Sequence, residues 1–133
     1  MSVDDLVGIA HTGWVWVVEF TDEFEDWWGG LDVDQQAALG LRIDLLESRG
    51  PDLGRPAVDR ISGSRHHNMK ELRASEGGAL RVLFAFDPRR QAILLLGGDK
   101  SGQWAEWYDW AIPGADDLYD EYLDELREEG LIE

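Results

Sequence analysis

The chain of 133 residues suits one domain with one hydrophobic core, and its 44% hydrophobic content with seven Trp excludes a disordered polypeptide. The absence of Cys excludes disulfides and thiolate metal sites, and no stretch has the pattern of a signal peptide or the length of a membrane span. The net charge of −16 excludes long-range attraction to nucleic acid, and we expect a single cytoplasmic domain over residues 1–133.

The first elements predicted along the chain are a buried strand and a helical hairpin. Residues 14–20 are mainly β-branched and aromatic, as is typical of a buried strand. Thr21 and Asp22 are the predicted caps of the short aromatic helix that follows. A second helix begins after Asp32 or Asp34 and runs to about Ser48. Two amphipathic helices of this kind need a sheet to cover.

The middle of the chain predicts a loop followed by three strands. Residues 51–64 contain Pro and Gly at several positions, which is typical of a loop. Strands are predicted over residues 69–73, 80–86 and 92–96, and the two turn signals between them indicate an antiparallel meander. Alternation in the central strand places the Arg81 side chain on the face opposite to Val82 and Phe84.

The last elements predicted are two helices. Residues 104–110 indicate a short helix that ends at Pro113-Gly114. The pattern over residues 115–129 is strongly amphipathic, with eight Asp or Glu on the outer face. The element order is therefore β-α-α-β-β-β-α. It predicts an α+β fold in which an N-terminal helical hairpin and a C-terminal helix pack on a small, curved, antiparallel-rich sheet.

Two motifs could suggest a cofactor or a metal ion, but neither has the required spacing. Residues 97–101 hint at a phosphate loop, yet Asp99 and Leu94 stand where that motif needs Gly. His66 and His67 are adjacent, so their side chains point to opposite faces of an extended segment. We expect no cofactor and no metal. Either imidazole could act as a general acid or base, or form ordinary hydrogen bonds.

Positive charge gathers in the middle of the chain, where residues 42–100 hold eleven of the twelve Lys and Arg. The predicted hairpin could bring Arg73 and Arg81 together, and two close guanidinium groups repel each other unless an anion lies between them. That anion is either a phosphate or carboxylate ligand, or a carboxylate of the chain such as Glu71, Glu76 or one from the C-terminal helix. Downstream aromatic residues suit either stacking on nucleic-acid bases or a place in the core: Trp104, Trp107 and Tyr108.

Three stretches of the sequence resemble a known family. They read SRHHNMKELR, ALRVLFAFDPRRQAILLLGGDKSG and WYDWAIPGADDLYDEYLDEL, and VVEFTDEFEDWWGGL precedes them. Over residues 14–126 the chain is similar to the RelE/HigB-like toxins of bacterial type II toxin–antitoxin modules, and most similar to their phage-derived HigB-type subgroup. The resemblance implies the RelE-like microdomain fold.

The resemblance also implies a ribosome-dependent mRNA endonuclease (an mRNA interferase) that inhibits translation. In such toxins the ribose 2′-OH attacks the adjacent phosphate, which requires a base, an acid and cations. Arg73 and Arg81 match family positions for the scissile phosphate. Proton transfer would fall to Lys70 or to one of the two His residues, and a further basic residue follows the last strand. The candidate catalytic residues are Arg81, Arg73, Lys70, His66, His67 and Lys100.

The partners implied by the resemblance are a cognate helix-turn-helix antitoxin, the ribosome and mRNA, with operator DNA reached only through the antitoxin and no membrane involved. Two other functions remain open. One is a catalytically inactive RelE-fold binding module that acts only through its antitoxin partner. The other is a protein that uses the arginine pair to hold a small carboxylate ligand. The acidic C-terminal helix, which is unusual for this family, either packs away from the basic site or covers it.

Overall fold

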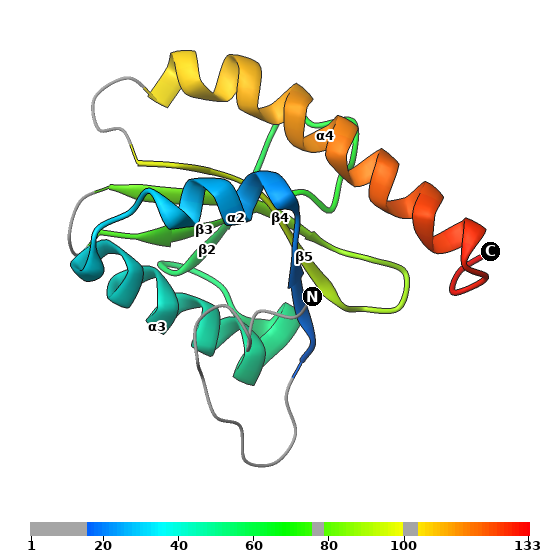
Figure 1. Ribbon diagram of the computed structural model, residues 1–133, viewed down its shortest axis with the longest axis horizontal. Coiled ribbons are helices and arrows are strands. Elements are labelled where there is room, and N and C mark those ends of the chain that lie inside the picture. The colour runs from blue at the N-terminus through cyan, green and yellow to red at the C-terminus, as the bar shows by residue number, and fades with distance from the viewer. Residues whose placement is uncertain (1–15, 76–78, 100–103) are drawn as a thin grey trace.

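The computed structural model describes residues 16–75, 79–99 and 104–133. Its centre is a five-stranded, unclosed sheet in the order β1-β5-β4-β3-β2 (Figure 1). β1 runs parallel to β5, and all other neighbouring strands are antiparallel. The strands are β1 (Val18–Phe20), β2 (Val58–Arg60), β3 (Lys70–Ala74), β4 (Leu80–Phe86) and β5 (Ala92–Gly98).

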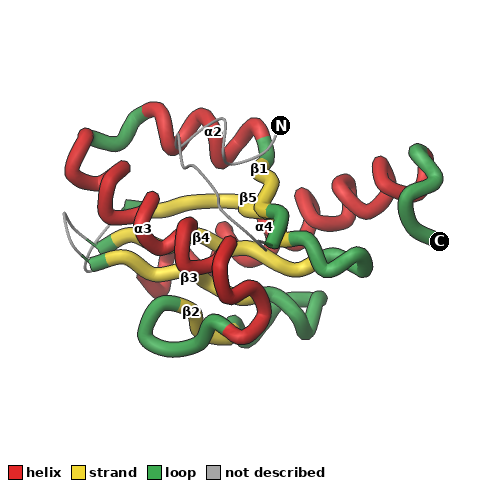
Figure 2. The backbone as a smooth tube through the Cα atoms, turned by 90° about the horizontal axis from the view of Figure 1, so that it is seen from below, coloured by secondary structure: helices red, strands yellow, loops and turns green. Residues whose placement is uncertain are grey.

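Helices cover both faces of this sheet. The helices α2 (Asp22–Gly29) and α3 (Val33–Arg49) lie on one face, and α4 (Trp104–Glu128) lies on the other (Figure 2). A 3-10 turn, Gly50–Asp52, follows α3. None of the helices in the described ranges is long and apolar enough to cross a membrane. The predicted α+β fold, with a helical hairpin and a C-terminal helix on a curved sheet, is confirmed.

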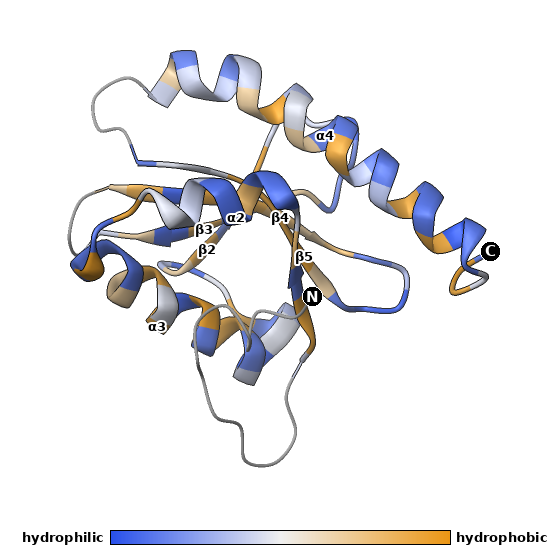
Figure 3. Ribbon diagram, viewed as in Figure 1, coloured by the Kyte–Doolittle hydropathy of each residue, from blue (hydrophilic) through white to orange (hydrophobic). Residues whose placement is uncertain are grey.

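Each face of the sheet has its own hydrophobic core. Phe24, Leu39 and Phe84 are fully buried between the helical hairpin and the sheet. Leu83 and Ala111 are fully buried between α4 and the other face. Figure 3 shows α4 as a largely hydrophilic helix with hydrophobic residues at intervals along it. Alternation along β4 therefore divides its side chains between the two cores, as the sequence predicted.

The predicted starts of the first two helices are confirmed by their capping hydrogen bonds. Thr21 Oγ1 accepts a hydrogen bond of 3.0 Å from the backbone N–H of Phe24. Asp32 and Gln35 form a reciprocal capping box at the start of α3, so Asp32 and not Asp34 is the cap. The first strand was predicted over residues 14–20; β1 begins at Val18, so residues 16 and 17 lie before it, and residues 14 and 15 lie outside the described residues.

Two local predictions are wrong. The predicted loop over residues 51–64 contains β2, because the buried Val58 pairs with Leu72 and adds a strand at the edge of the sheet. The predicted break at Pro113-Gly114 is absent, and α4 runs through it. Side chains are buried at every fourth position on both sides of Pro113, so packing on the sheet outweighs the lost hydrogen bond of the proline. These residues are Trp107, Ala111, Ala115 and Tyr119.

The end of β5 explains the two glycines that hinted at a phosphate loop. A Cβ on Gly97 would overlap the indole ring of Trp27, and a Cβ on Gly98 would overlap the indole ring of Trp107. Trp27 belongs to α2 of the helical hairpin, and Trp107 belongs to α4. The glycines therefore let two helices approach the same strand from opposite faces.

This packing predicts that Gly97→Ala and Gly98→Ala each lower the free energy of unfolding by about 1–3 kcal/mol, because the new methyl groups overpack the indole rings. Urea denaturation followed by Trp fluorescence would measure the change. Gly40→Ala in α3 is the matched control. No heavy atom lies within 4 Å of its added Cβ, so it should raise stability by about 0.5–1 kcal/mol. Unchanged stability in both strand variants would contradict the packing argument.

Candidate functional site

The structure brings Arg73 and Arg81 together. The two residues are direct partners in the antiparallel register of β3 and β4. Cross-strand partners point to the same face, and here it is the face that α4 covers. The Arg73 side chain is 36% exposed and the Arg81 side chain is 18% exposed. The predicted arginine pair is therefore confirmed as a geometric feature.

The anion between the two arginines is the carboxylate of Glu71, whose side chain is only 2% exposed. Arg73 Nε donates a hydrogen bond of 2.6 Å to Glu71 Oε1, and Arg81 Nε lies 3.9 Å from the same oxygen. Tyr108 donates its phenolic hydrogen to Glu71 Oε2. A buried carboxylate is costly unless cations and donors surround it, and these three side chains provide them.

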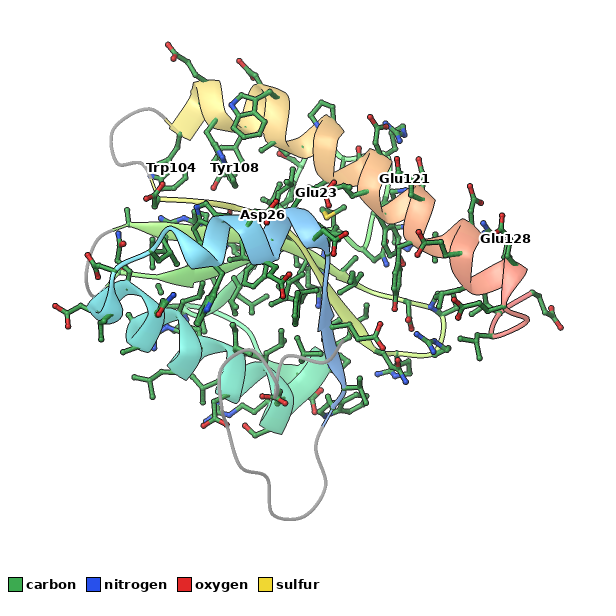
Figure 4. The ribbon with its side chains drawn as sticks, viewed as in Figure 1. Glu23, Asp26, Trp104, Tyr108, Glu121 and Glu128 are labelled. Atoms are coloured by element: carbon green, nitrogen blue, oxygen red, sulfur yellow. The ribbon has the colours of Figure 1, made fainter. Side chains whose placement is uncertain are left out.

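The first turns of α4 cover this cluster. Trp104 lies with its ring centroid 5.1 Å from the Arg81 guanidinium carbon, which is a cation–π contact. Figure 4 shows Trp104 and Tyr108 pointing from the start of α4 toward the sheet. Burial, with the hydrogen bond to Glu71, raises the pKa of Tyr108 to about 12, so the phenol is protonated at neutral pH. The arginine pair is thus covered by the aromatic start of α4, whereas the acidic stretch predicted over residues 115–129 contacts the loop before β3 through Asp116 and Asp120.

A groove beside this cluster leads from solvent to the arginine pair. Its volume is about 280 Å³, and it lies between the edge of the sheet and α4. It is lined by Arg60, Ile61, Ser62, Glu71, Arg73, Tyr108 and Ile112. Arg73 also lies 3.5 Å from Asp59, so its guanidinium is held by carboxylates from two strands. The groove therefore gives access to Arg73 and not to Arg81, and the Glu71 side chain that also lines it is only 2% exposed.

Lys70 does not join the arginine pair. It is a cross-strand partner of Phe84, and its Nζ lies 5.6 Å from the Phe86 ring centroid. Both aromatic residues belong to the core on the α2 and α3 side of the sheet. Lys70 therefore lies on the face opposite to Arg73 and Arg81, because it stands three positions from Arg73 along the strand.

His66 is held in a contact between a loop and α4. Its Nε2 lies 2.7 Å from Asp120 Oδ1, and its ring packs edge-on against Tyr119. Arg65 also bonds Asp120, and it lowers the pKa of that carboxyl together with His66. His67 is exposed, and Lys100 lies outside the described residues, as does Glu76. Within the described ranges, no group of three or more His, Asp or Glu could hold a metal ion.

The sequence interpretation did not identify Tyr108 as a partner of Glu71. Tyr108 was expected either to stack on bases or to lie in the core, and its docking on the sheet could not be read locally. The proximity of Glu71 to Arg73 had a local signal, because residues two apart on a strand share a face. The same rule places Lys70 on the other face.

Removing the buried carboxylate should destabilise the protein strongly. We expect Glu71→Gln to lower the free energy of unfolding by about 3 kcal/mol, because the two arginines then face each other without a counter-charge. Chemical denaturation would measure this loss. Glu121→Gln, on the exposed face of α4, is the control and should change stability by less than about 0.5 kcal/mol. Equal effects of the two substitutions would refute the role assigned to Glu71.

The raised pKa of Tyr108 predicts a loss of stability at high pH. Its pKa in the folded protein, about 12, lies above the ordinary value of 10.0. The protonated phenol therefore stabilises the fold fully below pH 10, and this contribution is lost as the pH rises from 10 to 12. Denaturation at successive pH values should show a steeper fall for the unmodified protein than for Tyr108→Phe. Identical pH profiles would count against the Tyr108–Glu71 hydrogen bond.

Comparison with known proteins identifies the family. Residues 26–120 match the family described as "Phage derived protein Gp49-like (DUF891)". The chain is 54% identical over 101 residues to "Putative toxin HigB3" of Mycobacterium tuberculosis (strain ATCC 25618 / H37Rv), covering 76% of this chain and 88% of that protein. It is 45% identical over 118 residues to "Putative toxin HigB2" of the same strain, covering 87% of this chain and 57% of that protein. The chain therefore belongs to the phage-derived, Gp49-like family of HigB/RelE type, and the family resemblance found in its sequence is confirmed.

Proposed function

We propose that this protein is the toxin of a type II toxin–antitoxin module and acts as a ribosome-dependent mRNA endonuclease that inhibits translation. The names of the two relatives support the toxin assignment. The observation that supports the nuclease assignment is the cross-strand pair of Arg73 and Arg81, which share the Glu71 carboxylate, beside an open groove. Two guanidinium groups that share one carboxylate could hold a phosphate in the same way.

The proposed reaction begins when the scissile phosphate takes the position of the Glu71 carboxylate between the two arginines. The ribose 2′-oxygen then bonds to the adjacent phosphorus, and the bond from phosphorus to the 5′-oxygen breaks. The products are a 2′,3′-cyclic phosphate and a free 5′-OH. Arg73 and Arg81 would stabilise the extra negative charge of the pentacovalent phosphorane, which is where preorganised cations contribute most.

Two groups beside the arginine pair suit the proton transfers. Once the phosphate has displaced it from the arginine pair, the Glu71 carboxylate could accept the proton of the 2′-OH. Tyr108 could donate its proton to the leaving 5′-oxygen, because its hydroxyl lies beside the arginine pair and is protonated at neutral pH. The other candidates, His66, His67 and Lys70, need a larger rearrangement to reach the same phosphate, and Lys100 stays a candidate from sequence alone.

The proposed partners are a cognate helix-turn-helix antitoxin that holds the toxin inactive, and the ribosome with its mRNA. Operator DNA would be contacted only through the antitoxin. The ribosome would align the RNA strand, so the toxin itself needs few groups at the reacting phosphate. The proposed site of action is the cytoplasm, where translation occurs.

A second function, a catalytically inactive module that acts only through its antitoxin, is favoured by one observation. The Glu71 carboxylate already pairs with the arginines, and Trp104 and Tyr108 cover them. The charged groups of this cluster therefore have partners inside the protein when no substrate is bound. This alternative expects tight antitoxin binding with no cleavage of mRNA. The use of the arginine pair to hold a small carboxylate ligand is a third possibility, which ligand binding lost in Arg81→Ala would support.

Expression without antitoxin tests the first proposal. We expect the unmodified protein to arrest translation and growth, and 5′-end mapping of cellular mRNA to reveal new cleavage sites. Arg81→Ala should lower cleavage by about 10²–10³-fold, because a cation that stabilises the phosphorane is lost. Arg81→Lys should recover part of the activity, since it keeps the charge and loses the bidentate geometry.

Arg127→Ala is the matched control, because Arg127 pairs with Asp124 near the end of α4 and should not affect cleavage. Immunoblotting and denaturation of the purified variants separate lost chemistry from lost folding. Normal growth and unchanged mRNA ends with abundant, folded, unmodified protein would reject the nuclease and favour the inactive binding module.

A further inference from the structure

A second pair of cations lies on the face of the sheet opposite to the arginine pair. Arg60 of β2 and Lys70 of β3 are direct cross-strand partners, so both side chains point to the same face. Like charges placed directly opposite each other destabilise a sheet. The Lys70 ammonium group lies 5.6 Å from the ring centroid of Phe86 on β4, the strand on the other side of β3 from Arg60.

These two cations differ from most of the others because they lack a carboxylate partner. Within the described ranges, the structure contains no ion pair for Arg60 or Lys70. Six other arginines are paired with Asp or Glu: Arg55, Arg65, Arg73, Arg81, Arg89 and Arg127. Arg49 and Arg90 also have no ion pair among the described residues, but Arg60 and Lys70 are cross-strand partners, so their two charges could be shared by one external anion.

The pair borders a groove that could receive this anion. The groove has a volume of about 270 Å³ and lies between β2 and the segment that follows α3. Two carboxylates also line it, and one of them, Asp59, is already bound by Arg55 and Arg73. Its lining residues are Pro51, Asp52, Leu53, Gly54, Arg55, Val58, Asp59, Arg60 and Lys70.

Arg60 connects this groove with the one beside the arginine pair. It lines both grooves, which lie on the two sides of the edge strand β2. An extended anionic polymer could therefore pass around the edge of the sheet and meet cations on both faces. The placement of cations on both faces suits an RNA backbone better than a single small anion, because one phosphate cannot reach both faces at once.

We propose that Arg60 and Lys70 form a second phosphate site, which binds the sugar–phosphate backbone of the RNA strand at a nucleotide flanking the one held by Arg73 and Arg81. The identity of the polymer rests on the proposed function. Contacts to the backbone carry no sequence information, so this site positions the strand and does not select its bases. Lys70 then acts by charge, and proton transfer belongs to other groups.

Equilibrium binding of a short, mixed-sequence, fully 2′-O-methylated RNA tests the proposal. This RNA has no free 2′-OH and cannot be cleaved by the proposed reaction, so binding is measured apart from activity. Fluorescence anisotropy over a series of NaCl concentrations gives the slope of log K against log salt. Arg60→Ala and Lys70→Ala should each reduce that slope by about 0.7, the value for one lost phosphate contact on a single strand.

Arg60→Lys should keep the slope of the unmodified protein, and so should the control Arg127→Ala. A slope that Arg60→Ala or Lys70→Ala leaves unchanged would overturn the site, and so would failure of the unmodified protein to bind this RNA. Loss of antitoxin binding with intact RNA binding would also overturn it and assign the pair to a protein partner.

Failure of the second site and failure of the proposed function can be told apart. RNA binding that depends on Arg60 and Lys70, without any new mRNA ends in cells, would reject the nuclease and leave the phosphate site standing. New mRNA ends in cells, together with a salt slope of RNA binding that is unchanged in Arg60→Ala and Lys70→Ala, would reject only the second site.

Discussion

The buried carboxylate of Glu71 determines how the α4 side of the sheet is built. It lies between two arginines on neighbouring strands and accepts a hydrogen bond from Tyr108 of α4, so three elements share one charge. A carboxylate that is 2% exposed persists only with such partners. The start of α4 is consequently fixed over the arginine pair, with Trp104 stacked on Arg81. The substrate phosphate of the proposed reaction would have to replace this carboxylate.

Charge is separated between the two ends of the molecule. Around β2, Lys and Arg outnumber Asp and Glu in the linings of the two grooves on either side of the edge strand. Between the start of α2 and the second half of α4, a groove of about 440 Å³ has only carboxylates as its charged lining (Figure 4, where Glu23 and Glu121 are labelled). Those carboxylates are Glu19, Asp22, Glu23, Glu121, Glu125 and Glu129. RNA would thus approach the β2 edge and be repelled from the opposite end, so a net charge of −16 is compatible with a local phosphate site.

The acidic C-terminal helix has a structural use besides solubility. Its carboxylates Asp116 and Asp120 hold the loop that leads into β3, through Ser64, Arg65 and His66. The start of α4 contacts the arginine pair through aromatic residues, and the carboxylates near the two arginines are those of Glu71 and Asp59 on the sheet. The helix therefore covers the site with aromatic rings while its negative charge is used elsewhere.

Features that depend on local rules could be predicted from the sequence. Alternation gave the correct bounds of β4 and the correct face for Arg81, and side-chain capping placed the starts of α2 and α3 to within one or two residues. Features that depend on tertiary packing could not be predicted. The continuous path of α4 through Pro113 requires the sheet beneath it, and β2 forms only because β3 offers an edge. At the site, Tyr108 reaches a carboxylate 37 positions away, which no local pattern encodes.

Single-turnover cleavage of mRNA by purified protein on programmed ribosomes tests most directly whether Arg73 and Arg81 hold the scissile phosphate. We predict that Arg73→Lys and Arg81→Lys each slow the chemical step by at least about tenfold while the Kd for the programmed ribosome changes little, because they act on the phosphorane and not on docking. Equal cleavage rates for both variants and the unmodified protein, at saturating ribosome concentration, would contradict the account.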